Sequence, residues 1–68
     1  MKEYILEDEY IELIKLIKLM RISESGGQAK LMVEDGIVKV NGQTELRKRA
    51  KLRRGDIVRI FNHEVIIK

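Results

Sequence analysis

One stretch of the chain decides its fold class: residues 25–42, which read SGGQAKLMVEDGIVKVNG. Its first half predicts a helix over about 26–35, because the apolar side chains recur at helical spacing and share one face. Ser25 is followed three residues later by Gln28, the spacing of a capping box at the start of a helix. Gly36 is a natural end point for this helix, because glycine adopts a left-handed φ without strain.

The second half of the stretch predicts a hairpin. At Val38 and Val40 the period of the apolar residues changes to two, which is the period of a strand. Asn41-Gly42 is the strongest short-range signal for a hairpin turn, and a return strand is expected over about 43–46. The stretch therefore joins a helix to antiparallel strands, a combination that is typical of α+β folds.

The chain before this stretch predicts a first helix, from Asp8 or Glu9 to about Met20. An acidic residue at its start can cap free N–H groups and suits the positive end of the helix dipole. The polar strip of this helix is narrow, so most of its surface must be covered. Either its own domain encloses it, as we expect in so small a chain, or it docks against a partner. The polar strip of this helix consists of Glu12, Lys15 and Lys18.

The residues before this helix, 3–6, predict a short strand or an extended arm.

The chain after the stretch predicts the rest of a small sheet. The elements expected are, in order, a turn at Gly55-Asp56, a strand over 57–61, a turn at Asn62-His63 and a strand over 64–67. The predicted fold class is therefore α+β, with two packed helices followed by a small antiparallel β-sheet and a short N-terminal strand. We expect a single domain over residues 1–68.

Composition narrows the classes of function. The absence of cysteine excludes a disulfide scaffold, a cysteine nucleophile and a thiolate metal site. His63 is the only histidine and is expected to be an exposed turn residue, so we expect no metal site. No acid–base or nucleophile pair can be assembled, so we expect no catalytic residue, no cofactor and no small-molecule substrate. The chain has no apolar run of membrane-spanning length and no signal-peptide pattern, so we expect no membrane contact, and the lack of cysteine fits a reducing compartment.

Charge is distributed unevenly along the chain. The net charge is +3, but residues 1–20 carry three lysines and five acidic residues, so the excess of cations lies in residues 21–68. Ala50 and Leu52 interrupt the basic stretch 47–54 and are expected to anchor it with its cations outside. This uneven positive charge favours a polyanionic partner, although a solvated loop kept charged for solubility gives the same pattern. The cations of the stretch are Arg47, Lys48, Arg49, Lys51, Arg53 and Arg54.

Two smaller features bear on such a partner. Gly26 and Gly27 are poor helix formers in the first turn of the second predicted helix. Either they allow close packing against the first helix, or they leave backbone N–H groups bare to receive a phosphate. The aromatic residues Tyr4, Tyr10 and Phe61 are not interleaved with the basic stretch, so the sequence does not support a base-stacking platform.

Motifs at residues 23–58 resemble those of the S4 RNA-binding domain, also called the αL motif. They are SGGQAK at 25–30, GIVKVNG at 36–42 and GDIV at 55–58. The longer segment SESGGQAK at 23–30, together with RKR at 47–49, is similar to the small stand-alone bacterial S4-like proteins of the YaaA/YbcJ type. The resemblance extends from about Tyr10 to Lys68.

The resemblance implies a non-catalytic, cytoplasmic RNA-binding protein of bacteria. S4 domains hold structured RNA, often ribosomal or transfer RNA, with the N-terminal part of their second helix and the adjoining turn, so association with the ribosome is expected. Many of them carry an arginine directly after the serine that opens this helix, whereas Gly26 occupies that position here. Lys30 and the basic stretch are therefore expected to supply the charge.

The candidate RNA-binding residues fall into three groups. Ser25, Gly27 and Gln28 are expected to present donors at the start of the second helix to phosphate or ribose. The cations expected to neutralise phosphates are Lys30, Arg47, Lys48, Arg49 and Lys51. Cations of second rank are Arg21, Arg53 and Arg54.

Two other functions fit parts of the pattern. A protein-interaction adaptor docking through the apolar first helix would leave an exposed apolar patch around Leu16 and Leu19. A duplex-DNA binder is less well supported, because neither predicted helix carries a row of Arg, Asn or Gln suited to a major groove.

Overall fold

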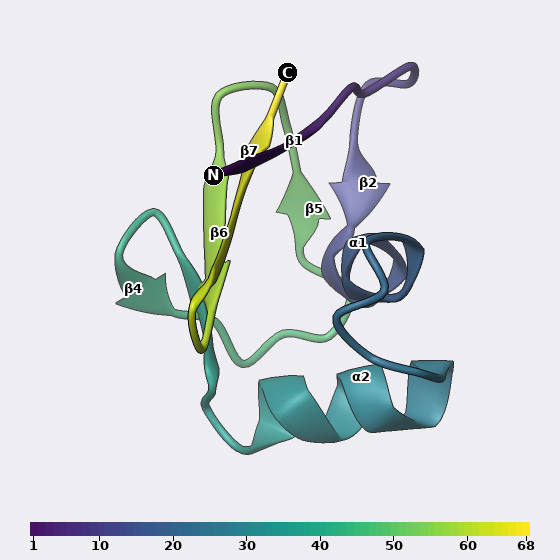
Figure 1. The fold of residues 1–68 in the computed structure, drawn as a ribbon, viewed down its shortest axis with the longest axis vertical. Coiled ribbons are helices and arrows are strands. Elements are labelled where there is room, and N and C mark those ends of the chain that lie inside the picture. Colours follow the sequence, from purple (N-terminus) through teal and green to yellow (C-terminus); the bar gives the residue numbers. More distant parts are fainter.

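The chain forms two helices and seven short strands in the computed structural model, which describes residues 1–68 (Figure 1). This α+β class agrees with the prediction, although the strand expected over 43–46 is shorter. The elements are β1 (Lys2–Tyr4), β2 (Ile11–Glu12), α1 (Leu13–Leu19), α2 (Gly26–Glu34), β3 (Val38–Val40), β4 (Gln43–Thr44), β5 (Lys51–Leu52), β6 (Ile57–Ile60) and β7 (His63–Ile67).

Five of the strands form one sheet, in the order β1-β7-β6-β3-β4. The strands β3, β4, β6 and β7 pair antiparallel, whereas β1 runs parallel to β7, with Lys2 opposite Val65. The predicted N-terminal strand is therefore present, but the sheet is mixed and not purely antiparallel, because β1 pairs with the last strand. The pairing continues past β1, where the N–H of Leu6 donates to the carbonyl of Lys68 at 2.7 Å.

The other two strands, β2 and β5, form a separate ribbon in which Ile11 lies opposite Leu52. This ribbon occupies the place of the first turn of the predicted first helix. The helix α1 begins at Leu13 and not at Asp8 or Glu9, so the predicted start was wrong. Ile11 fits a helical pattern and a strand equally well, and its pairing with Leu52 makes it a strand.

The start of α1 has no side-chain cap, so the predicted acidic cap was also wrong. The N-cap position is Glu12, whose side chain accepts no bond there. The N–H groups of Leu13 and Ile14 donate instead to the carbonyls of Ala50 and Lys48, at 2.9 and 3.1 Å. The returning backbone thus satisfies donors that a capping side chain would otherwise satisfy.

The second helix follows the prediction. Ser25 is the N-cap, and its Oγ accepts the N–H of Gln28 at 3.1 Å. The Oε1 of Gln28 accepts the N–H of Glu24 at 2.7 Å, which completes a reciprocal cap. The helix ends at Glu34, and Gly36 follows with φ of +73°, the left-handed conformation expected of it.

The last hairpin differs from the prediction by one residue. Ile60 pairs with His63, so the turn consists of Phe61 and Asn62, and His63 is the first residue of β7. Burial of Ile60 and Val65 on the inner face sets this register, because a shift by one residue would turn every side chain of β7 to the opposite face.

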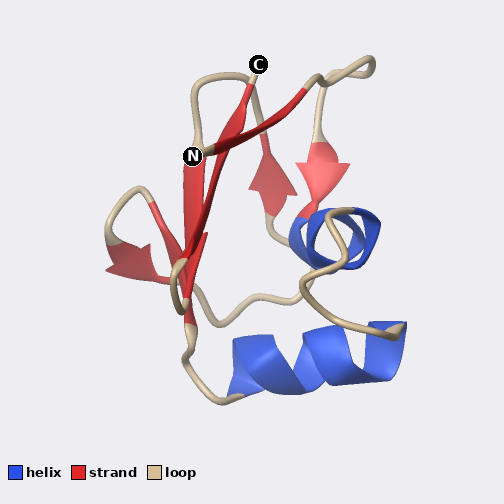
Figure 2. Ribbon diagram, viewed as in Figure 1, coloured by secondary structure: helices blue, strands red, loops and turns tan.

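Both helices and the β2–β5 ribbon lie on one side of the five-stranded sheet, and no helix covers its other face (Figure 2). The core between these layers is a cluster of 13 buried apolar residues. From α1 it includes Leu13, Leu16 and Ile17, while Leu19 is 51% exposed, so the domain itself encloses most of the apolar stripe of α1. Neither helix is long and apolar enough to cross a membrane.

Candidate nucleic-acid interface

The basic stretch 47–54 consists of the short strand β5 between two turns, in which the N–H groups of Ala50 and Asp56 donate to the carbonyls of Arg47 and Arg53, at 3.2 and 3.0 Å. Ala50 and Leu52 are anchored in the core, as predicted, with 6% and 1% of their surfaces exposed. Since these two side chains turn into the core, the odd-numbered residues of the stretch stay exposed. Together with Ala50 they line an open hollow of about 400 Å³, which we call the basic hollow; its cations are Arg47, Arg49, Lys51 and Arg53.

One cation of the basic hollow, Arg47, is paired with a neighbouring carboxylate. Its Nη2 and Nε lie 3.0 Å from Oε1 and Oε2 of Glu45. The hydrogen bonds from Arg47 lower the pKa of the Glu45 carboxyl, and they raise the pKa of Arg47 in turn. The Arg47 side chain is 81% exposed. Since a guanidinium has about five N–H donors, Arg47 keeps free donors for a phosphate.

The other three cations of the basic hollow have no carboxylate partner. Arg49 and Arg53 are exposed. The Nζ of Lys51 lies 4.9 Å from the centroid of the Tyr10 ring, within reach of a cation–π interaction. Tyr10 comes to this position because β2 pairs with β5, and the sequence, in which no aromatic residue is interleaved with the basic stretch, gave no sign of it.

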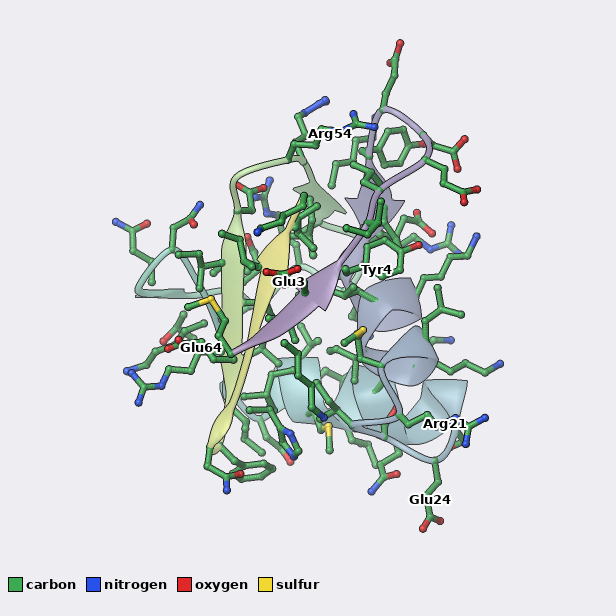
Figure 3. The ribbon with its side chains drawn as sticks, turned by 45° about the horizontal axis from the view of Figure 1, so that its top comes forward. Glu3, Tyr4, Arg21, Glu24, Arg54 and Glu64 are labelled. Carbon is green, nitrogen blue, oxygen red and sulfur yellow. The ribbon has the colours of Figure 1, made fainter.

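Two cations of the basic stretch do not line the hollow. The Nζ of Lys48 pairs with the carboxylate of Glu34 at the end of α2. The Nη2 of Arg54 donates to the carbonyl of Leu6 at 2.6 Å, which ties the β5–β6 turn to the segment after β1 (Figure 3). Both side chains join segments of the fold, so they are less available to a phosphate than the cations of the hollow.

The start of α2 is the second place where candidate residues gather. The side-chain acceptors of Ser25 and Gln28 are used by the cap, but the N–H groups of Gly26 and Gly27 have no partner. A Cβ at Gly26 would meet no atom within 4 Å, and a Cβ at Gly27 would meet only the Oγ of Ser25, at 3.9 Å. Close packing against α1 therefore does not explain the two glycines. The alternative, bare donors at a helix start, remains.

Two further candidates lie near α2. Lys30 is exposed on the helix, and Arg21 is exposed in the connection from α1, with φ of +57° (Figure 3). Gly26 and Glu34, at the two ends of α2, are about 12 Å apart at 1.5 Å per residue. Since Lys48 reaches Glu34, the basic stretch approaches the end of α2 and not its start. The structure thus divides the candidate residues between two places.

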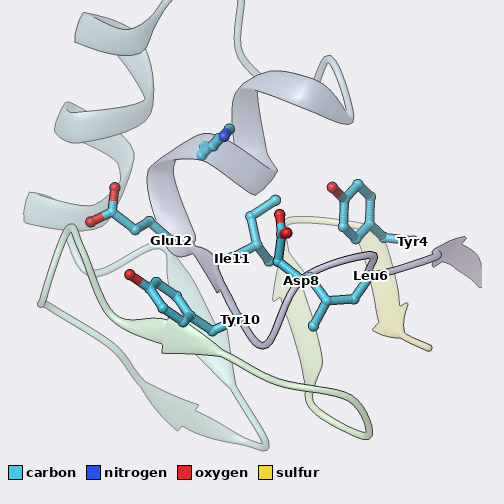
Figure 4. Close-up of a pocket in the computed structure, with 7 residues that line it drawn as sticks. Tyr4, Leu6, Asp8, Tyr10, Ile11 and Glu12 are labelled. Carbon is cyan, nitrogen blue, oxygen red and sulfur yellow. The ribbon is translucent and has the colours of Figure 1, made fainter.

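A different hollow, of about 360 Å³, lies beside the segment that leads into α1 (Figure 4). Its lining includes two tyrosines, two carboxylates and one lysine: Tyr4, Tyr10, Asp8, Glu12 and Lys15. The excess of carboxylates there disfavours a polyanion. No group of three or more His, Cys, Asp or Glu side chains is arranged to hold a metal ion. The basic hollow is therefore the better candidate for binding a polyanion.

Comparison with known proteins identifies the family. A family model described as "S4 domain" matches residues 4–68. The chain belongs to the S4 domain family. This S4 domain is 46% identical over 56 residues to YbcJ of Escherichia coli (strain K12). The aligned region covers 82% of this chain and 80% of that protein. YbcJ of Shigella flexneri matches with the same identity and coverage. The resemblance that the motifs indicated is confirmed.

Two solved structures share the fold of this S4 domain. The solution structure of YbcJ from E. coli matches with a TM-score of 0.76 at 41% identity, covering 98% of this chain and 86% of that one. That structure contains an αL motif involved in RNA binding, so the predicted αL fold is confirmed. The crystal structure of the 30S ribosomal protein S4e from Thermoplasma acidophilum matches with a TM-score of 0.70 at 24% identity, covering 85% of this chain and 31% of that one. This second likeness is one of fold alone.

Proposed function

We propose that this S4 domain is a non-catalytic protein that binds structured RNA, of the ribosomal or transfer RNA class, through its phosphates. The observation that carries the proposal is the basic hollow, where four cations surround about 400 Å³ and no carboxylate is part of the lining. Such a cluster of cations suits a phosphate backbone, and contacts to phosphates fix the register of a bound nucleic acid. The αL motif of the YbcJ structure, which is involved in RNA binding, supports the same function.

The start of α2 supplies a second kind of contact. The free N–H groups of Gly26 and Gly27 lie at the positive end of the helix, where an oxygen of phosphate or ribose can accept from them. Lys30, one turn later, adds a charge. A-form RNA displays phosphates and 2′-hydroxyls beside a wide, shallow minor groove. A surface with these two parts therefore recognises the shape of an RNA more than its base sequence.

The proposed RNA class is the one that the resemblance to S4 domains implies. Contacts to phosphate and ribose need a stable duplex or fold to fix their spacing, and ribosomal and transfer RNAs provide it. Both are met in the cytoplasm, so we propose a cytoplasmic protein that associates with the ribosome or with transfer RNA. Neither a membrane nor a small-molecule substrate is part of this proposal.

The adaptor function loses its main support. It required an exposed apolar patch around Leu16 and Leu19 on α1. Leu16 is 1% exposed and belongs to the core, so it contributes nothing to such a patch. Leu19 alone, at 51% exposure, does not form a contiguous patch.

Binding to total bacterial RNA across a salt series tests the proposal. Neutralising about four phosphates gives a slope of about −3 in log affinity against log salt. The double variant Arg49→Ala/Arg53→Ala removes two exposed, unpaired cations, and we expect it to lose affinity and about half of that slope. The double variant Lys15→Ala/Lys18→Ala is the matched control, because it removes the same charge from the exposed side of α1.

The two double variants separate a site from a general field. Circular dichroism first confirms that both are folded. If both weaken RNA binding equally, the basic hollow is only a solvated surface and the proposal fails. Binding that does not change with salt would also contradict it, since phosphate contacts release counterions. Competition with a DNA duplex of equal length separates an RNA target from a DNA target.

A further inference from the structure

The open face of the five-stranded sheet carries cations that the proposed function does not use. Lys39 on β3, Arg59 on β6 and Glu64 on β7 lie opposite one another across three strands. Val38 and Val58, their neighbours in sequence, are buried in the core, so this row points away from the helices. Lys39 and Arg59 are exposed, and neither forms an ion pair.

Phe61 lies in the turn at the end of the same face. It is the only phenylalanine of the chain, and it is 63% exposed. Its φ is +54°, in the left-handed region, which a bulky residue adopts only at a cost and where glycine or asparagine is usual. The turn could therefore be built more easily without this ring. An exposed ring held in a strained conformation points to a contact made outside the chain.

The ring and the cations border one hollow. It encloses about 420 Å³, within the range of sites for small ligands. Its apolar lining comes from the ring and from two isoleucines. Its charged lining comes from the sheet row, the three residues Lys39, Arg59 and Glu64 that lie opposite one another. Its side-chain lining consists of Phe61, Ile37, Ile57, Lys39, Arg59 and Glu64.

We infer that this hollow binds one unpaired nucleotide of a bound RNA, with the base stacked on the Phe61 ring and the phosphate held by Arg59 and Lys39. The inference rests on the proposed function and deepens it, since it adds a site for an unpaired base to the phosphate contacts. An aromatic ring stacks on any base, because every base has a π-face. The pairing of β3 with β6 brings Lys39 to the side of Arg59, so this platform depends on strand pairing and lies apart from the basic stretch.

Charge complementarity selects a nucleotide over an apolar protein segment. A helix or strand without charge that covered the hollow would bury Lys39 and Arg59 without partners, which is costly. A nucleotide offers its phosphate to these cations and its base to the ring. The carboxylate of Glu64 opposes the phosphate, so its removal should strengthen the binding.

Two RNA probes with the same stem test the inference. One is a hairpin whose loop contains unpaired nucleotides, one of them the fluorescent base 2-aminopurine, and the other is the stem alone as a blunt duplex. Phe61→Asn removes the ring and keeps the turn, because asparagine tolerates a positive φ. Leu46→Asn is the matched control, since Leu46 is an apolar side chain that is 60% exposed and does not line the hollow.

We expect Phe61→Asn to weaken binding of the hairpin by about tenfold, the loss of one base–aromatic stack. It should also abolish the quenching of 2-aminopurine that stacking causes in the wild type, and leave binding of the blunt duplex unchanged. Leu46→Asn should change neither probe. Glu64→Gln should strengthen binding of the hairpin, and weaker binding in this variant would contradict the phosphate contact.

The outcomes separate this inference from the proposed function. If Phe61→Asn leaves the hairpin unaffected while both probes still depend on Arg49 and Arg53, the inference is overturned and the proposed function stands. The exposed ring then belongs to a contact with a protein. An equal loss on both probes also overturns the inference, because the ring then contacts no unpaired base. If the wild type binds neither probe, both proposals fail.

Discussion

The two parts of the proposed RNA surface are built in different ways. In the basic hollow the charges are on side chains, which stay exposed because Ala50 and Leu52 pack into the core where β5 pairs with β2. At the start of α2 the donors are backbone N–H groups, and the helix itself sets their directions. The first part depends on contacts between distant segments, and the second depends on a few consecutive residues. Each part can therefore be disturbed without the other.

The largest effect is expected from Leu52→Ala, which should disrupt the basic hollow. Leu52 is 1% exposed and lies opposite Ile11 in the β2–β5 ribbon. Truncation of a core leucine costs about 2–5 kcal/mol, a large part of the stability of so small a domain. Denaturant unfolding measures the loss. Leu46→Ala, at a side chain that is 60% exposed, is the control and should change stability by about 0.5 kcal/mol or less. Equal stabilities of the two variants would contradict the role of Leu52 as an anchor.

A smaller effect on stability is expected from Ser25→Ala, which disturbs only the start of α2. The Oγ of Ser25 accepts the N–H of Gln28, and loss of such a cap costs about 1 kcal/mol. The free energy of unfolding should fall accordingly. Ser25→Asp restores a cap and suits the helix dipole, but its charge opposes a phosphate. It should therefore recover stability while it weakens RNA binding. Recovery of both would show that no phosphate approaches this helix start.

Gly26→Arg would add a side-chain cation to the start of α2 and so make it more like the basic hollow. Many S4 domains carry an arginine at this position, and a side chain there would meet no atom within 4 Å of its Cβ. One exposed ionic contact is worth about 0.2–1 kcal/mol, so affinity for structured RNA should rise by about 1.4- to fivefold. The salt slope should become steeper by about one unit. Gly26→Gln, measured in the same titration, is the uncharged control. An equal gain in the two variants would assign the effect to helix propensity.

The smallest effect is expected at the ion pair inside the basic hollow. Hydrogen bonds from Arg47 lower the pKa of the Glu45 carboxyl, so the pair stabilises the fold above the usual pKa of a carboxyl. That contribution is lost as the pH falls through the lowered pKa of Glu45. Glu45→Gln should therefore destabilise the protein slightly at neutral pH and not in acid, as unfolding at the two pH values will show. It should also release Arg47 and strengthen RNA binding, and weaker binding would contradict the place of Arg47 in the hollow.

Those parts of the fold that depend on neighbouring residues could be predicted from the sequence. Ser25 and Gln28 mark the start of α2, Gly36 marks its end, and Asn41-Gly42 marks the hairpin. The β2–β5 ribbon could not be predicted, because each strand has two residues and its pairing partner is distant in sequence. The turn at residues 61–62 was misplaced for a similar reason, since packing of the whole sheet sets its register.

The candidate site shows the same division. Ala50 and Leu52 indicated which side chains of the basic stretch point outward, and the basic hollow agrees with that. The ion pair of Lys48 with Glu34 could not be foreseen, because its partner lies on another element. The positions of Tyr10 beside Lys51 and of Phe61 beside the sheet row also follow from strand pairing, which the order of residues does not reveal.

The parallel pairing of β1 with β7 sets the order in which the nascent chain can fold. Lys2 lies opposite Val65, so the edge of the sheet at β1 cannot close until nearly all of the chain described here has been synthesised. Contacts between residues so far apart in sequence also slow folding. Both helices and the β2–β5 ribbon are synthesised before β7, so the basic hollow can form while β1 still waits for its partner. We therefore expect closure of the sheet edge to come late in folding, so that a chain emerging from a ribosome presents its cations to RNA before that step is complete.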